Sequence, residues 1–178
     1  MIPAKIPLQR ASLLAPLLAL CAWPARAEAP MIRLRSWTAP VPAGWHLVSV
    51  TQVADQPKVD GFAQKTYAGD VWVLPDGPNP RDLLLIRSEF DDGSQCSGLG
   101  MAMALGGTVD FQMDLIMPMH GCNFDLSLPG GKIQYVRARS WSEGQAFVAR
   151  CFGPAADAVP LKAACDAVTD AFDAAAQP

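Results

Sequence analysis

Methionine and histidine side chains gather in the middle of the chain, where they could bind a soft metal. Residues 117–121 read Met-Pro-Met-His-Gly, and Met101, Met103 and Met113 lie upstream. Thioether and imidazole groups are ligands that suit Cu(I). The candidate copper ligands are Met117, Met119, His120, Met101 and Met103. The alternative interpretation is that the methionines fill an irregular apolar core, a role that methionine often takes. That alternative explains Met119 and His120 least, because they follow a predicted strand.

The Met-Pro-x-His-Gly string is similar to one in the YtkA-like and FixH-like exported β domains. The similarity covers residues 117–121. It supports the alternative in which the protein binds copper as a cofactor. In the main interpretation we expect no cofactor.

The N-terminal segment has the pattern of a secretory signal peptide. Basic residues Lys5 and Arg10 precede the apolar run 11–23, and Ala25-Arg26-Ala27 follows it. A basic start, a short apolar run and an Ala-x-Ala site predict cleavage after Ala27. The run is shorter than the roughly 20 residues that a membrane-spanning helix needs. We therefore expect residues 1–27 to be removed, with no stable membrane insertion of residues 28–178.

Removal of the signal peptide would change both the charge and the cysteine count. The whole chain of 178 residues has a net charge of −3 and five cysteines. The mature chain would have a net charge of −6 and four cysteines, because three basic residues and Cys21 lie in the leader. An acidic chain without a basic patch argues against nucleic acid as a partner.

The four remaining cysteines indicate disulfides in an exported chain. They are Cys96, Cys122, Cys151 and Cys165, and they allow three pairings. Local geometry favours Cys151–Cys165, because the first residue closes a predicted strand and the second lies on a predicted helix soon after. This choice leaves Cys96–Cys122. A four-thiolate zinc site or a redox dithiol would usually show C-x-x-C spacing, which the sequence lacks.

Catalytic residues are harder to assign. The sequence contains no G-x-S-x-G elbow, and only His46 and His120 could serve as an imidazole base. We assign no catalytic residues, and whether the protein is an enzyme stays open. A separate pattern is a candidate partner-binding surface formed by Arg137, Arg139 and Trp141, which share one face of a predicted strand. The alternative is an exposed charged face without a partner.

The elements that would position these residues are mostly strands. Residues 28–44 are expected to be irregular because they contain several prolines and Gly44. Apolar and β-branched runs predict strands over 45–53, 71–74, 82–89, 108–117, 124–128, 132–141 and 146–151. Short turns between the last four predict an antiparallel meander.

Two of these elements have a clear apolar pattern. In 108–117 the odd positions are apolar from Val109 to Met117, which predicts a half-buried strand with an acidic outer face. From Pro160 onward an apolar stripe recurs at helical spacing, which predicts an amphipathic helix. The stripe consists of Leu161, Cys165, Val168 and Phe172. Residues 97–107 are ambiguous, since methionine and alanine favour a helix and four glycines oppose it.

The predicted fold is a single α+β domain over residues 28–178, an antiparallel sheet with a C-terminal helix on one face and two disulfides. The export signal, the Pro-Ala-Gly-Trp segment 42–45, the meander and the closing helix resemble the PsbP-like family, mainly over residues 130–175. The resemblance implies a central antiparallel sheet between helices, and a binding or accessory module without catalytic residues. We therefore expect a periplasmic or secreted module that binds a protein or small ligand in the bacterial cell envelope. A periplasmic Cu(I)-binding protein is the alternative.

Overall fold

The computed structural model describes residues 29–35, 37–115, 120–140 and 144–175. The predicted signal peptide, Met117, Met119 and Trp141 lie outside these residues. Among the helices of the described segments, none combines the length and the apolar character needed to cross a membrane.

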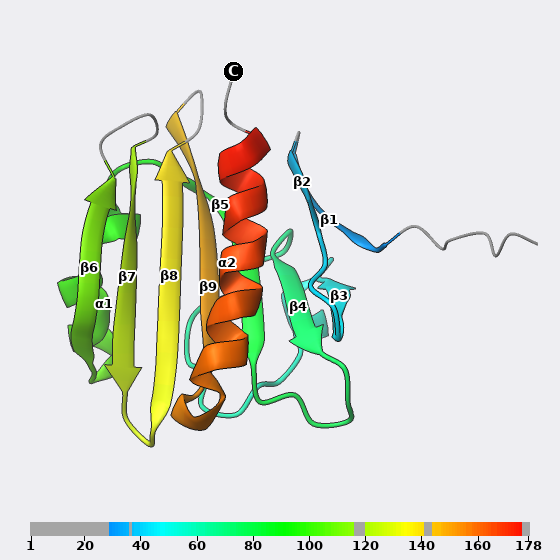
Figure 1. Ribbon diagram of the computed structural model, residues 1–178, viewed down its shortest axis with the longest axis horizontal. Helices are drawn as coiled ribbons and strands as arrows, with labels where there is room; N and C mark the ends of the chain where they lie inside the picture. The colour runs from blue at the N-terminus through cyan, green and yellow to red at the C-terminus, as the bar shows by residue number, and fades with distance from the viewer. Residues whose placement is uncertain (1–28, 36, 116–119, 141–143, 176–178) are drawn as a thin grey trace, which may run out of the picture.

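A seven-stranded antiparallel sheet forms the body of the molecule (Figure 1). Its strands are β3 (Trp45–Ser49), β4 (Val71–Pro75), β5 (Leu83–Phe90), β6 (Thr108–Leu115), β7 (Gly121–Leu128), β8 (Lys132–Ser140) and β9 (Gln145–Pro154). In space they follow the order β3-β4-β5-β9-β8-β7-β6. The chain therefore builds one meander from β3 to β5, crosses to the far edge at β6, and returns by a second meander until β9 pairs with β5. The predicted meander of the last four strands is confirmed.

Helix α2 (Ala158–Ala175) packs on one face of the sheet, in front of β9 in the view of Figure 1. The four residues of its predicted apolar stripe are all buried. The disulfide Cys151–Cys165 joins this helix to β9. We call this side of the sheet, with Phe147, Cys151 and Tyr135, the α2 face. The predicted α+β fold with a packed C-terminal helix is confirmed.

A β-hairpin also covers the α2 face, over residues that the sequence analysis expected to be irregular. Strands β1 (Met31–Leu34) and β2 (Trp37–Pro40) pair with each other, and Trp37 is buried against Phe147 and Phe172. The expectation was wrong because the proline residues lie outside or at the end of the strands. Pro30 precedes β1 and Pro40 ends β2, so neither interrupts the short ladder.

Helix α1 (Gly98–Leu105) lies behind the sheet in Figure 1, on the opposite side, which we call the α1 face. Gly98 allows a close approach, since a Cβ there would lie 2.6 Å from Gln112 Oε1 and 3.2 Å from Phe124 Cγ. The short helix η2 (Ser94–Cys96) precedes α1, and the disulfide Cys96–Cys122 ties it to β7. Both predicted disulfides are thus confirmed, and the ambiguous segment is a helix.

Strand β6 differs from the prediction of a half-buried strand. It is an edge strand, and most of its side chains are exposed. A bulge between Val109 and Phe111 breaks the alternation, so that Val109 pairs with Leu126 on the α1 face while Phe111 pairs with Asp125 on the α2 face. Since α2 lies over β8 and β9, this outer part of the α2 face stays uncovered in Figure 1.

Candidate ligand-binding site

The α1 face contains a pocket of about 1010 Å³. It lies over β5 and β9, between α1 and the loop that leads into β4. Residues 64–70 of the loop form one wall, and Met101, Ala104 and Leu105 of α1 form the other. Arg33 and Arg35 of the hairpin and the end of β5 complete the rim.

The floor of the pocket is charged because β5 changes character along its length. On the α1 face, Leu83 and Leu85 are followed by Arg87 and Glu89 at the same alternating positions. Arg150 of β9 pairs with Leu85 and faces the same side. Asp70, at the end of the loop, adds a second carboxylate. We call Asp70, Arg87, Glu89 and Arg150 the charged floor.

Two ion pairs and one longer contact connect the charged floor. Arg87 Nη2 donates to Asp70 Oδ2 at 2.7 Å, and Arg150 Nη2 donates to Glu89 Oε1 at 3.0 Å. Arg87 Nη1 lies 3.6 Å from the same Glu89 oxygen. Arg87 also donates to the carbonyl oxygen of Lys65. Glu89 is therefore shared between the two guanidinium groups.

Burial sets the electrostatics of these groups. Arg87 and Arg150 are each only 7% exposed. Desolvation lowers the pKa of Arg150, which the carboxylate of Glu89 partly offsets. Burial likewise raises the pKa of Asp70, against the hydrogen bond from the Tyr67 amide and the charge of Arg87. Both shifts disfavour the charged forms, and the neighbouring opposite charges oppose them.

The sulfur of Met101 lies next to this floor and accepts from three N–H donors. They are Gln64 Nε2 at 3.6 Å, Gln134 Nε2 at 3.3 Å and Arg150 Nη1 at 3.1 Å. A thioether is a weak acceptor. Gln64 Nε2 also donates to Gln134 Oε1 at 3.0 Å, whereas Arg150 Nη1 has the sulfur as its acceptor and is only weakly satisfied.

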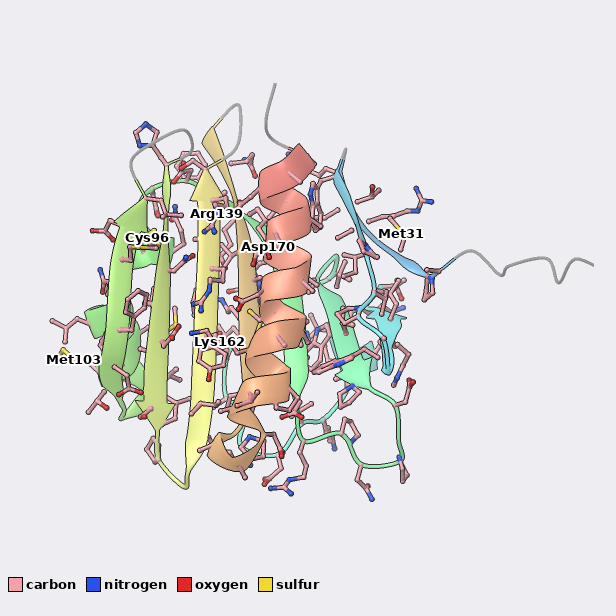
Figure 2. All side chains as sticks on the ribbon, in the orientation of Figure 1. Met31, Cys96, Met103, Arg139, Lys162 and Asp170 are labelled. Atoms are coloured by element: carbon pink, nitrogen blue, oxygen red, sulfur yellow. A yellow bond between two sulfur atoms is a disulfide. The ribbon has the colours of Figure 1, made fainter. Side chains whose placement is uncertain are left out.

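The candidate copper ligands do not come together in the described part of the chain. Met101 faces the pocket and its polar donors, whereas Met103 is 74% exposed and projects away from the sheet (Figure 2). His120 is exposed just before β7, and the remaining two candidates lie outside the described residues. Within those residues, histidine, cysteine and acidic side chains form no group of three that could hold a metal ion. The copper hypothesis stays a prediction.

Arg137 and Arg139 lie on one face of β8, as the sequence analysis expected, but neither is exposed. They are 4% and 6% exposed, which corrects the alternative of an exposed charged face. Arg137 pairs with Asp125 at 2.7 Å, and Arg139 pairs with Asp173 of α2 at 2.8 Å. Figure 2 shows Arg139 and Lys162 on the α2 side of the sheet. A partner surface at these residues stays a prediction.

Apart from Met101, the sequence analysis missed the pocket residues. One signal was present: Arg87 and Glu89 end a strand whose aliphatic run predicts cover on both faces, so charges there indicate a buried polar site. The position of Arg150 within the apolar segment Ala-Phe-Val-Ala-Arg-Cys gives the same indication. Asp70 carried no comparable signal, and Met101 was singled out only as a candidate copper ligand.

Comparison with known proteins adds no relative. Neither protein-family models nor the curated proteins give a match to this chain. The resemblance to the PsbP-like family therefore stays an expectation, and the functional interpretation depends on the pocket itself.

Proposed function

We propose that this protein is an exported, non-enzymatic binding module of the bacterial cell envelope, which takes a small ligand in the pocket on the α1 face. The single observation that carries the proposal is the pocket of about 1010 Å³ over a floor of buried charges. Ligand pockets usually have this size and combine apolar walls with a few polar groups that orient the ligand.

Export is supported by the two disulfides, since such bonds persist in oxidising compartments. The predicted cleavage after Ala27 agrees with this placement. Intact mass measurement of the protein from a periplasmic fraction tests it. We expect a chain that begins at Glu28 and holds two disulfides, and a full-length chain with five free thiols would contradict export.

Small-ligand binding can be tested by blocking the pocket. Ala104 lines the pocket from α1, so Ala104→Trp should fill part of it. Met103→Trp is the matched control, because the neighbouring side chain is exposed outside the pocket.

The measurement is ligand-observed NMR with three ring compounds of similar size: benzoate, benzamide and benzylamine. We expect at least one to bind the wild-type protein and the Met103→Trp variant, and to lose binding in Ala104→Trp. If none of the three binds, or if Ala104→Trp binds as well as wild type, the proposed function fails.

A further inference from the structure

We infer that the pocket selects an organic carboxylate, with the anionic group between Arg87 and Arg150 and an apolar body against the pocket wall. This inference rests on the proposed function and names the ligand class. Neither arginine is paired as fully as its five donors allow, and the surroundings carry an excess of positive charge.

The charges around the pocket favour an anion. Five basic residues line it, against the two carboxylates of Asp70 and Glu89. The basic residues are Arg33, Arg35, Lys65, Arg87 and Arg150. The first three are exposed, and no ion pair involves them within the described segments. An excess of three positive charges in a chain of net charge −3 makes this a local positive site in an acidic protein.

Unpaired donors lie on the buried arginines. The Nε atoms of Arg87 and Arg150 are buried without a hydrogen-bond partner among the described residues. Arg150 Nη1 reaches only the sulfur of Met101, at 3.1 Å. Buried charged donors without acceptors are costly, and carboxylate oxygens are the acceptors that match a guanidinium. A bound carboxylate would supply what the protein lacks at this position.

Glu89 shows that a carboxylate fits between the two arginines. Its Oε1 lies 3.0 Å from Arg150 Nη2 and 3.6 Å from Arg87 Nη1. The same group limits ligand charge, because a second anion beside Glu89 feels repulsion that grows with its charge. A singly charged carboxylate is therefore favoured over a dianionic phosphate ester.

The wall of the pocket suits an apolar body. Tyr67 and Phe90 are exposed at its rim, and Leu105 lines the side formed by α1. The guanidinium of Arg87 lies 5.2 Å from the centre of the Tyr67 ring. An aromatic ring can stack beside this pair, so an aryl carboxylate uses both the charged floor and the wall.

The test is calorimetric titration of the oxidised mature protein with benzoate, benzamide and phenyl phosphate. Benzamide has the shape of benzoate without its charge. We expect benzoate to bind about tenfold or more tightly than benzamide, the usual value of a charged hydrogen-bonded pair. Phenyl phosphate is expected to bind less tightly than benzoate at a pH where it carries two charges.

Three variants are expected to differ in their effect on benzoate affinity. Arg150→Met should weaken benzoate binding about tenfold or more, and Glu89→Gln should strengthen it several-fold because it removes a neighbouring negative charge. Arg139→Met is the matched control. That arginine is equally buried, at 6% exposure, but on the α2 face, so benzoate affinity should stay unchanged.

The outcomes separate the inference from the proposed function. If benzamide binds as tightly as benzoate, or if Glu89→Gln weakens benzoate binding, the ligand class is wrong while the pocket remains a binding site. If phenyl phosphate binds best, the preference for a singly charged carboxylate is overturned. If no probe binds, both the inference and the proposed function fail. If Arg150→Met does not fold, the change in benzoate affinity caused by Glu89→Gln still tests the inference.

Discussion

On the α2 face, one continuous apolar layer joins the sheet, the hairpin β1–β2 and helix α2. On the α1 face, two separate apolar layers lie at either end, one under α1 and one under the loop before β4. The charged floor lies between them. The same strands build both faces: Ile86 of β5 and Ala149 of β9 pair on the α2 face, one residue away from Arg87 and Arg150.

This difference indicates that the fold itself does not require the charged residues on the α1 face. Buried ion pairs rarely add stability over apolar side chains of similar volume, because desolvation offsets the attraction. On the α2 face the neighbouring positions of β5 and β9, Ile86 and Ala149, are covered by apolar contacts, and the buried arginines of that face lie on β8. Packing alone does not require the charged floor at this position, which supports the proposal that its side chains serve ligand binding.

The largest effect is expected from Phe147→Ala on the α2 face. Phe147 is buried and contacts Trp37, with ring centres 4.9 Å apart. Its removal leaves a cavity in a closed layer, which should lower the free energy of unfolding by about 3–5 kcal/mol. Urea unfolding measures the change. Phe90→Ala, at an exposed phenylalanine of β5, should lose less than about 0.5 kcal/mol. Equal losses of stability in the two variants would contradict the contrast between the packed α2 face and the exposed end of β5.

The two disulfides should differ in what they affect. Replacing Cys151 and Cys165 with alanine should lower the free energy of unfolding by about 3 kcal/mol and leave benzoate affinity unchanged. Replacing Cys96 and Cys122 should have a similar effect on stability, but it should also weaken binding, because η2 and α1 line the pocket. Unfolding and calorimetry of both double variants test this. Equal affinity in the two would show that the bond on the α1 face does not shape the pocket.

A pH effect of moderate size should come from Asp82, which precedes β5 and packs against Gly153. Its buried Oδ1 has no hydrogen-bond partner among the described residues. Burial, with a contribution from Asp157, raises the pKa of Asp82 to about 6. The folded state therefore binds the proton more tightly than the unfolded state does. The contribution of Asp82 to stability is fully present below about pH 4 and is lost as the pH rises through about 6.

Asp82→Asn should remove this part of the pH dependence. We expect a change on the order of 1 kcal/mol across the window, discounted because the side chain is only partly buried. Urea unfolding at several pH values measures it. Asp92→Asn is the control, since hydrogen bonds from Ser94 lower the pKa of Asp92 and give the opposite sign. An unchanged slope in Asp82→Asn would contradict the assignment. Asp82 also differs from Asp70, the other acid whose pKa burial raises, because the carboxylate of Asp70 pairs with Arg87.

The smallest effect on stability is expected from the charged floor itself. The double variant Arg150→Met with Glu89→Gln removes one ion pair and leaves the Arg87–Asp70 pair in place. We expect the free energy of unfolding to change by less than about 1 kcal/mol. Benzoate should bind the double variant more weakly than the wild type but more tightly than Arg150→Met alone, because Glu89→Gln offsets part of the loss. A loss of several kcal/mol would show that the charged floor stabilises the fold, and the functional contrast between the two faces would fail.

The elements that could be predicted from the sequence are those whose local pattern matches their final environment. The stripe from Leu161 to Phe172 repeats at helical spacing and faces one continuous layer, so its burial follows from periodicity. The bulge in β6 could not be predicted, because Val109 and Phe111 read as the same face until the register with β7 is known. The hairpin was missed because proline was treated as a breaker where it borders a strand.

The pocket depends on contacts between distant parts of the chain. Glu89 and Arg150 are 61 residues apart, and they meet only because β5 and β9 pair. Sequence spacing gives no information about that pairing. What the sequence does contain is the charge itself, placed within apolar strand segments, and this is the pattern that indicates a buried polar site.

The position of β9 in the sheet has a consequence for the order of folding. It is the last strand along the chain, yet it lies between β5 and β8 near the centre of the sheet. A growing chain that ends before residue 145 has only two three-stranded meanders, each with an unpaired edge where β9 belongs. Insertion of the final strand joins the halves, so cooperative folding waits for the C-terminal part of the polypeptide. The two halves of the sheet can therefore become a single body only after β9 has been synthesised.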